Sequence, residues 1–260
     1  MPDRAIQLVV QYDGTDFSGW QVQPETRTVQ GVLEATLDRL AGGPVRVTGA
    51  GRTDAGVHAS GQAAGATLAE HWTPERIRRA LNQQLPHDVW IVAAHEMAPS
   101  FHARFSATRR RYRYVVGLRD DSWSPFRRRF LHPWPGPVAP DKAHLDWCAG
   151  QLLGTHVFRG FAVRGTAPDD DNHECEVHDC RWTKSDGLLT LEIEANRFLH
   201  HMVRFLVGTM LEIGAGRRSR ADFTALLAAP DNDDVSPPAP ASGLTLERVT
   251  YPAHLYLANR

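Results

Sequence analysis

Residues 174–196, ECEVHDCRWTKSDGLLTLEIEAN, contain two runs of mixed apolar and polar residues separated by Asp186 and Gly187. An Asp-Gly pair is typical of the two-residue turn of a β-hairpin, where both positions take a positive φ. The pattern therefore predicts two antiparallel strands, 174–185 and 188–196. Helical patterns follow this hairpin, and separate stretches of strand and helix are typical of α+β folds.

The rest of the chain repeats this mixture of strands and helices. Helix N-caps are predicted at Thr28, Thr73 and Ser219, where a short polar side chain precedes a helical pattern. Further helices are predicted over 141–154 and 198–214, and strands over 4–13, 44–50, 60–68, 88–97, 109–118 and 243–251. The expected fold class is α+β, with two split-βαβ-like halves and largely antiparallel sheets.

Four prolines interrupt the chain near its middle, in HPWPGPVAP at 132–140. Proline lacks an N–H group and fixes φ, so this cluster cannot lie within a helix or a central strand. We therefore expect an N-terminal α+β half at 1–132, a proline-rich linker at 133–141 and a C-terminal α+β half at 142–260.

Composition narrows the class of protein. The chain has 260 residues, of which 42% are hydrophobic and 23% charged, with a formal net charge of −1, so it can bury a sizeable core. It has no run of about 18 apolar residues, and its N-terminus lacks the parts of a signal peptide, so we expect no membrane span and a cytoplasmic location. The three cysteines, Cys148, Cys175 and Cys180, are too few for a disulfide framework.

Basic residues are concentrated in one region. Nine arginines lie between Arg104 and Arg129, against two acids, Asp120 and Asp121. Guanidinium groups bind phosphates bidentately and stack on bases, so this segment is a candidate nucleic-acid-binding surface. The alternative is a solvated, charged face on a strand and its loop.

The segment GRTDAGVHA at 51–59 is the strongest candidate for chemistry. It places Asp54 between two glycines, Gly51 and Gly56, which allow a ligand or another backbone to approach closely. An ionised Asp54 could act as a nucleophile or a base, with Arg52 as its electrostatic partner or as a phosphate ligand. The alternative is an ordinary turn, in which the aspartate bonds its own backbone.

The sequence resembles the tRNA pseudouridine synthase A family over nearly its whole length. Six segments carry this resemblance, and they occur in the family's order: YDGTDFSGWQVQ at 12–23, RTVQGVLE at 27–34, GRTDAGVHA at 51–59, FHARFSATRRRYRY at 101–114, NRFLHHMVR at 196–204 and GLTL at 243–246.

This resemblance implies a fold, a reaction and a set of site residues. The expected fold is the pseudouridine synthase fold, with two halves joined around a central RNA-binding cleft. The expected reaction is isomerisation of uridine to pseudouridine in the anticodon stem-loop of tRNA, at positions 38 to 40, by a homodimer that uses no metal and no other cofactor. By the same resemblance, Asp54 is the catalytic aspartate, Arg52 and Arg204 surround it, Tyr112 stacks on the target base and Leu244 forms an apolar wall of the pocket.

The residues are compatible with this chemistry. The reaction breaks the bond between N1 and the ribose, turns the uracil and rejoins it through C5, so nothing enters or leaves. Asp54 could add to the ring, attack the sugar carbon or remove the 2′ proton, and the sequence does not choose between these roles. Tyr112 lies in an R-Y-R-Y alternation, which is equally typical of a strand with one aromatic and one basic face.

One stretch, 167–180, departs from the family's pattern. Its residues His173, Cys175, His178 and Cys180 have a zinc-like composition. A regular strand, however, would direct residues 173 and 175 to one face and residues 178 and 180 to the other. A zinc-dependent enzyme is therefore one alternative function, and a tRNA-binding module that has lost catalysis is another.

Overall fold

The computed structural model describes residues 3–166 and 172–257, and it divides the chain into two compact units. The first unit comprises Met1–Arg109 and Thr245–Arg260, and the second comprises Arg110–Leu244. The chain therefore enters the second unit near residue 110 and returns to the first near residue 245.

The proline-rich segment 133–141, predicted as a linker between two halves, is not the boundary between the two units. These units meet in the sequence near residues 110 and 245. The first proline of this segment belongs to the short strand β6 (His132–Pro133), which pairs in parallel with the end of β5 (Arg109–Gly117) inside the second unit. Proline is tolerated at such a position because a short edge strand does not need every N–H group. The cluster thus ends a strand locally, within one unit, instead of separating two domains.

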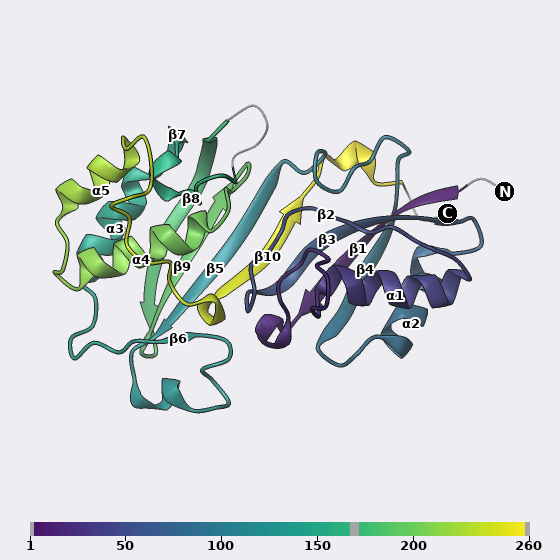
Figure 1. Cartoon of the computed structure of the whole chain (residues 1–260), viewed down its shortest axis with the longest axis horizontal. Coiled ribbons are helices and arrows are strands. Elements are labelled where there is room, and N and C mark those ends of the chain that lie inside the picture. The colour runs from purple at the N-terminus through teal and green to yellow at the C-terminus, as the bar shows by residue number, and fades with distance from the viewer. Residues whose placement is uncertain (1–2, 167–171, 258–260) are drawn as a thin grey trace. The chain divides into compact units, whose positions relative to one another are not determined.

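The first unit is a mostly antiparallel sheet with two helices. Its strands are β1 (Asp3–Tyr12), β2 (Thr48–Gly49), β3 (His58–Ala69), β4 (Val89–Met97) and β10 (Leu244–Thr250). The order is β4-β1-β3-β10, with β2 beside β3, and β10 runs parallel to β3. Helices α1 (Val29–Ala41) and α2 (Pro74–Gln84) lie on one face of this sheet (Figure 1).

Local sequence explains these elements. Ile6, Leu8 and Val10 alternate along β1 and are fully buried, as the period of a strand requires. Thr28 caps α1, because its side chain accepts a hydrogen bond from the Gly31 N–H group.

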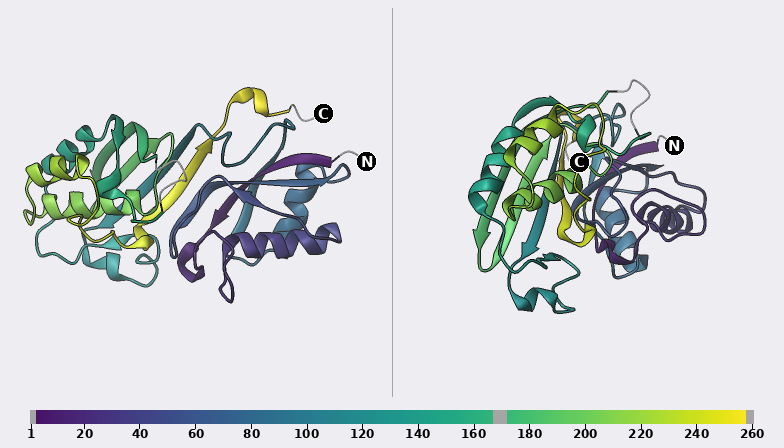
Figure 2. Two further views of the ribbon diagram at one scale, coloured as in Figure 1. Left: turned by 45° about the horizontal axis from the view of Figure 1, so that its top comes forward. Right: turned by 60° about the vertical axis from the view of Figure 1, so that its left-hand side comes forward.

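The second unit has the same two-layer construction. Its remaining strands are β7 (Gly154–Val157), β8 (Glu174–Ser185) and β9 (Leu188–Ala195), and the order is β5-β9-β8-β7 with antiparallel neighbours. Helices α3 (Lys142–Gln151), α4 (Met202–Gly214) and α5 (Arg220–Leu227) cover one face, as the turned views show (Figure 2). The predicted hairpin is confirmed, since Asp186 and Gly187 have φ of 51° and 75°.

Some predicted elements are shorter than expected, and two of them show the physical reason. Helix α4 begins at Met202 and not at residue 198, because His201 has a φ of 59° and cannot continue a right-handed helix. Within the predicted strand 44–50, only Thr48–Gly49 forms a strand, because the N–H groups of Val45 and Val47 donate to the side chains of Asp38 and Glu34.

The predicted α+β class with largely antiparallel strands is confirmed. Within residues 3–166 and 172–257, no helix is long and apolar enough to cross a membrane.

Candidate active site

Asp54 lies half-buried in the loop that connects β2 to β3. Its carbonyl oxygen accepts a hydrogen bond from the Val57 N–H group at 3.1 Å, which closes a turn directly after it. Gly56 has a φ of 78° within this turn, a conformation that glycine adopts without steric cost. The turn therefore fixes the backbone of Asp54 while its side chain stays accessible.

Thr53 anchors the loop on the other side of Asp54. Its hydroxyl lies 2.8 Å from the hydroxyl of Tyr12, at the end of β1, and its carbonyl accepts a hydrogen bond from the Trp20 N–H group at 3.0 Å. Burial raises the pKa of Tyr12 to about 12, so its hydroxyl keeps its proton at neutral pH. Asp54 thus follows a residue that is held at both its side chain and its backbone.

The segment that follows β1 packs against the same loop. The Gly14 N–H group donates to Nδ1 of His58 at 3.0 Å, and a Cβ atom on Gly14 would lie 2.0 Å from the carbonyl oxygen of Val57. Only glycine permits this approach. His58 is itself buried, so both ends of the Asp54 turn are bonded to the segment that follows β1.

Arg52, in contrast, is exposed. Its Nε donates to the Oε1 atom of Gln21 at 3.2 Å. Arg52 therefore offers its guanidinium group to solvent beside the Asp54 turn, where a phosphate could reach it.

In the second unit, Tyr112 lies on β5 with its ring buried. The ring meets Phe198 edge to face, with 5.2 Å between the centroids. Tyr114 is buried on the same side of the strand, while Arg111 and Arg113 are half-buried, which confirms the predicted alternation. The structure gives Tyr112 a packing role and leaves a role in stacking on a base as a prediction.

Arg204 lies in the first turn of α4 and holds the segment before Leu244. Its Nε donates to the Ala239 carbonyl at 2.8 Å, and the Ala239 N–H group donates to the Arg204 carbonyl at 3.0 Å. The hydroxyl of Tyr114 donates to the Pro240 carbonyl at 2.9 Å. Burial raises the pKa of Tyr114, and the charge of Arg204 opposes this effect. Leu244 is buried at the start of β10.

The four residues with zinc-like composition do not converge, so the described part of the chain gives no metal site among them. A bulge at His178 shifts the register of β8, so Cys175 and Cys180 are buried on one face instead of opposite faces. Burial raises the pKa of both thiols, that of Cys175 to about 11. Residues 167–171 of this stretch lie outside the described residues.

An acid on the neighbouring strand β9 reduces the excess positive charge of the arginines on β5. Glu192 of β9 accepts from Arg111 at 2.9 Å and also pairs with Arg181 of β8. A count along the sequence misses such cross-strand pairs, because they join residues far apart in the chain.

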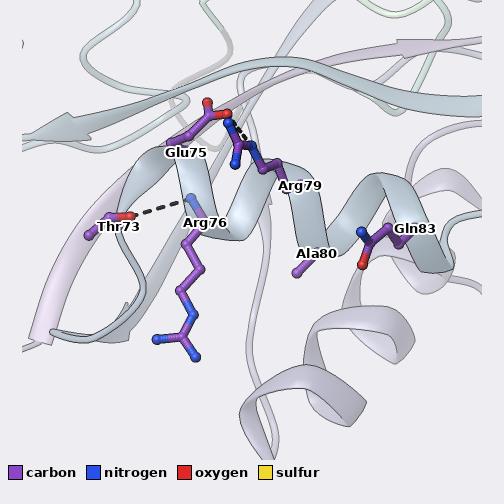
Figure 3. Close-up of a pocket in the computed structure, with 6 residues that line it drawn as sticks. All are labelled: Thr73, Glu75, Arg76, Arg79, Ala80 and Gln83. Atoms are coloured by element: carbon purple, nitrogen blue, oxygen red, sulfur yellow. Dashed lines mark hydrogen bonds and ion pairs between the residues drawn. The ribbon is translucent and has the colours of Figure 1, made fainter.

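A shallow hollow lies elsewhere, on the exposed side of α2 (Figure 3). It is lined by Thr73, Glu75, Arg76, Arg79, Ala80 and Gln83. All six belong to one helix and its N-cap, and none is a predicted site residue, so the hollow is a charged helix surface.

Two residues beside Asp54 were not predicted to have a role. Tyr12 and His58 both lie in segments that carry the family resemblance, YDGTDFSGWQVQ and GRTDAGVHA. Their contacts with Thr53 and Gly14 depend on the fold, since the bonded partners are 41 and 44 residues apart.

Comparisons with known proteins place the whole chain in one family. Residues 8–106 and 148–252 match a family model described as tRNA pseudouridine synthase. A protein from Azorhizobium caulinodans named tRNA pseudouridine synthase A is 40% identical over 253 residues, 96% of this chain and 95% of that protein. Proteins of the same name from Roseiflexus sp. (strain RS-1) and Latilactobacillus sakei are 43% and 39% identical, over 96% and 94% of this chain and 91% and 98% of their own lengths.

These matches define the class of protein as an enzyme, an isomerase. More narrowly, the chain belongs to the tRNA pseudouridine synthase family.

Proposed function

We propose that this enzyme converts uridine to pseudouridine in the anticodon stem-loop of tRNA, at positions 38 to 40, with Asp54 as its catalytic carboxylate and without a cofactor. The observation that carries this proposal is the turn around Asp54. Its backbone is bonded at Thr53 and Val57, while its side chain is half-buried and accessible. A rigid loop that presents one reactive group is the arrangement that positioning by an enzyme requires.

One carboxylate can serve this reaction, because the isomerisation exchanges the N1–C1′ bond for a C5–C1′ bond and needs no other reactant. The carboxylate can attack the ring or the sugar carbon, or it can take up the 2′ proton. The proton leaves C5, where the new bond forms, and the product gains a proton at N1. Each of these routes needs a carboxylate held close to the uridine, and the bonded backbone around Asp54 supports that role.

The other predicted site residues take separate roles in this proposal. Tyr112 stacks on the target base, which must leave its helical stack to be reached. Leu244 supplies an apolar wall, and Arg52 contacts the phosphate backbone from its exposed position. Arg204, which already holds Ala239, places its positive charge near the reacting uridine.

The partner in this proposal is tRNA, and the enzyme acts as a homodimer. An L-shaped tRNA is larger than a 28.9 kDa subunit, so two subunits can hold it at separated points. Sedimentation without RNA should give the mass of a dimer, and a fully active monomer would contradict this assignment.

The test of the catalytic role is Asp54→Asn, which keeps the size of the side chain and removes its charge. We expect no pseudouridine in a single-turnover assay with unmodified tRNA, while tRNA affinity stays nearly unchanged, because affinity comes mainly from phosphate contacts. The matched control is Glu70→Gln, which removes an exposed acid after β3 and should leave the rate as in the wild type.

Three outcomes would contradict the proposal or a part of it. Turnover by Asp54→Asn at the wild-type rate would exclude the catalytic role of Asp54. A wild-type protein that binds tRNA but forms no pseudouridine would instead indicate a binding module. Pseudouridine found at other positions than 38 to 40 would refute the proposed target alone.

A further inference from the structure

The loop over residues 118–131 is anchored at both ends on one strand. Its two ends meet where β5 and β6 pair, Val116 with His132 and Gly117 with Pro133. The Leu118 N–H group also donates to the Gly187 carbonyl at 2.8 Å, in the turn between β8 and β9. The loop is therefore a compact excursion with adjacent ends, of a kind that is frequently functional.

Interactions inside the loop give it a defined shape. Ser122 is buried against Gly117, where an added Cβ atom would lie 2.2 Å from its hydroxyl oxygen. The carbonyl of Ser124 accepts from the N–H groups of Arg127 and Arg128, both at 2.9 Å, and the Phe130 N–H group donates to the Arg127 carbonyl. Consecutive hydrogen-bonded turns therefore fix the backbone from which the exposed side chains of the loop project.

Three aromatic side chains of this loop are exposed to solvent. Trp123 is 53% exposed, Phe126 is 91% exposed and Phe130 is 51% exposed. Exposing large apolar rings is unfavourable in a free protein, so a group of them in one loop indicates an interaction site.

The same loop carries a net positive charge. It contains Arg119, Arg127, Arg128 and Arg129 against Asp120 and Asp121, and Arg127 pairs with Asp121. Rings interleaved with guanidinium groups match a partner that presents both flat bases and phosphates. A second copy of this loop fits poorly, since a symmetric contact would bring two positive loops together.

We propose that the loop 118–131 binds unpaired nucleotides of the tRNA substrate, with Trp123 and Phe126 stacking on bases and the arginines contacting phosphates. This inference rests on the proposed function, because tRNA is the partner there. The loop lies outside residues 8–106 and 148–252, so the family match assigns it no role. Its contribution is to affinity for unpaired RNA, and it takes no part in the chemical step.

The test compares a variant without the ring and a variant that keeps it. Phe126→Leu keeps an apolar side chain but removes the π-face, whereas Phe126→Tyr keeps a stacking surface. Because Phe126 is exposed, neither change should unfold the chain, and thermal unfolding checks this. The control is Trp90→Leu, an exposed aromatic residue on β4, whose strand 89–97 contains no arginine.

The probes are a short oligo(U), a short RNA duplex and unmodified tRNA. We expect Phe126→Leu to weaken oligo(U) and tRNA binding by about five- to 100-fold, as loss of one base–aromatic stack would. Phe126→Tyr and Trp90→Leu should bind like the wild type, and duplex binding should be equal for all four proteins. The single-turnover rate at saturating tRNA should not change, which separates this inference from the catalytic proposal.

Wild-type affinity of Phe126→Leu and of Trp123→Leu for oligo(U) and tRNA would overturn the inference, even if the wild type forms pseudouridine. A change of sedimentation mass in Phe126→Leu, with RNA affinity intact, would overturn it in favour of a contact between subunits.

Discussion

Of the contacts that hold Thr53, its hydrogen bond to the Tyr12 hydroxyl can be removed with the smallest other change to the side chains. Tyr12→Phe deletes the buried hydrogen bond to Thr53, together with the contact of the hydroxyl with Gln62, and keeps the ring. We expect about 1 kcal/mol less free energy of unfolding, and a single-turnover rate about ten- to 100-fold lower, because a displaced Asp54 no longer meets the base correctly. The tRNA dissociation constant should not change.

The matched control is Tyr251→Phe, which removes a buried hydroxyl that donates to the Ala103 carbonyl at 2.6 Å, away from the Asp54 turn. It should lower stability by a similar amount and leave the rate intact. Equal rates in both variants would mean that the contact between Tyr12 and Thr53 supports only the fold.

Tyr112 can be tested by separating its ring from its hydroxyl. Tyr112→Phe keeps the ring beside Phe198 and should preserve turnover, whereas Tyr112→Ala should lose base stacking at a cost of about 1–3 kcal/mol. An equal loss in both variants would assign the role to the hydroxyl. Loss of stability in both variants without loss of turnover would leave Tyr112 as a core residue only.

At the scale of one residue, the sequence predicted the loop around Asp54 but not the contacts that hold this loop. Asp54 could be placed in a loop because glycines flank it and a strand follows. The support from Tyr12 and His58 could not be predicted, because hydrogen bonds across more than 40 residues depend on strand order. The neutralising Glu192 was missed for the same reason.

At the scale of an element, β6 carries a histidine that responds to pH. His132 lies between the rings of Tyr114 and Trp134, and burial lowers its pKa because the charged imidazolium is disfavoured there. The unfolded chain takes up this proton near pH 6.5, but the folded chain does so only at lower pH. Stability should therefore fall as the pH drops below about 6.5.

The measurement is denaturant unfolding at about pH 7.5 and about pH 5.5, for the wild type and for His132→Phe, which keeps the ring contacts. The variant should lose less stability between the two values. Some loss should remain, because burial lowers the pKa of His95 in the same direction. An identical loss in both proteins would show that His132 is charged in the folded state.

Elements with strong local signals were predicted well. The N-cap predicted at Ser219 begins α5, where Asp222 completes a capping box, and the N-cap predicted at Thr28 begins α1. The bulge at His178 could not be predicted, because an extra residue in one strand becomes visible only against its partner strand. Because of this bulge, Cys175 and Cys180 lie on the same face of the sheet, whereas a regular strand would place them on opposite faces.

At the scale of the whole molecule, the first unit is built from both ends of the chain. Its second segment adds β10 beside β3, and the hydroxyl of Tyr251 bonds the Ala103 carbonyl. The N–H groups of Ala98 and Thr108 donate to the carbonyls of Leu255 and Thr250. The proline cluster predicted a single domain boundary near residue 133. Composition does not indicate that one unit is assembled from two segments far apart in the sequence.

A fragment of residues 1–109 should therefore be unstable, whereas a fragment of residues 110–244 should unfold cooperatively. The first fragment lacks β10 and the hydrogen-bond partners of Ala98, Ala103 and Thr108, which all lie in residues 245–257. Thermal unfolding followed by circular dichroism measures both fragments. Equal cooperativity in the two would contradict this expectation.

The same interleaving sets an order for the newborn chain on the ribosome. Residues 110–244 leave the exit tunnel before residues 245–257. The second unit can therefore fold while the first unit still lacks β10. The Asp54 turn, although made early, is attached to a sheet that is completed only after residues 245–257 have been made. A truncated translation product would therefore contain every predicted site residue up to Leu244 and still lack a finished first unit.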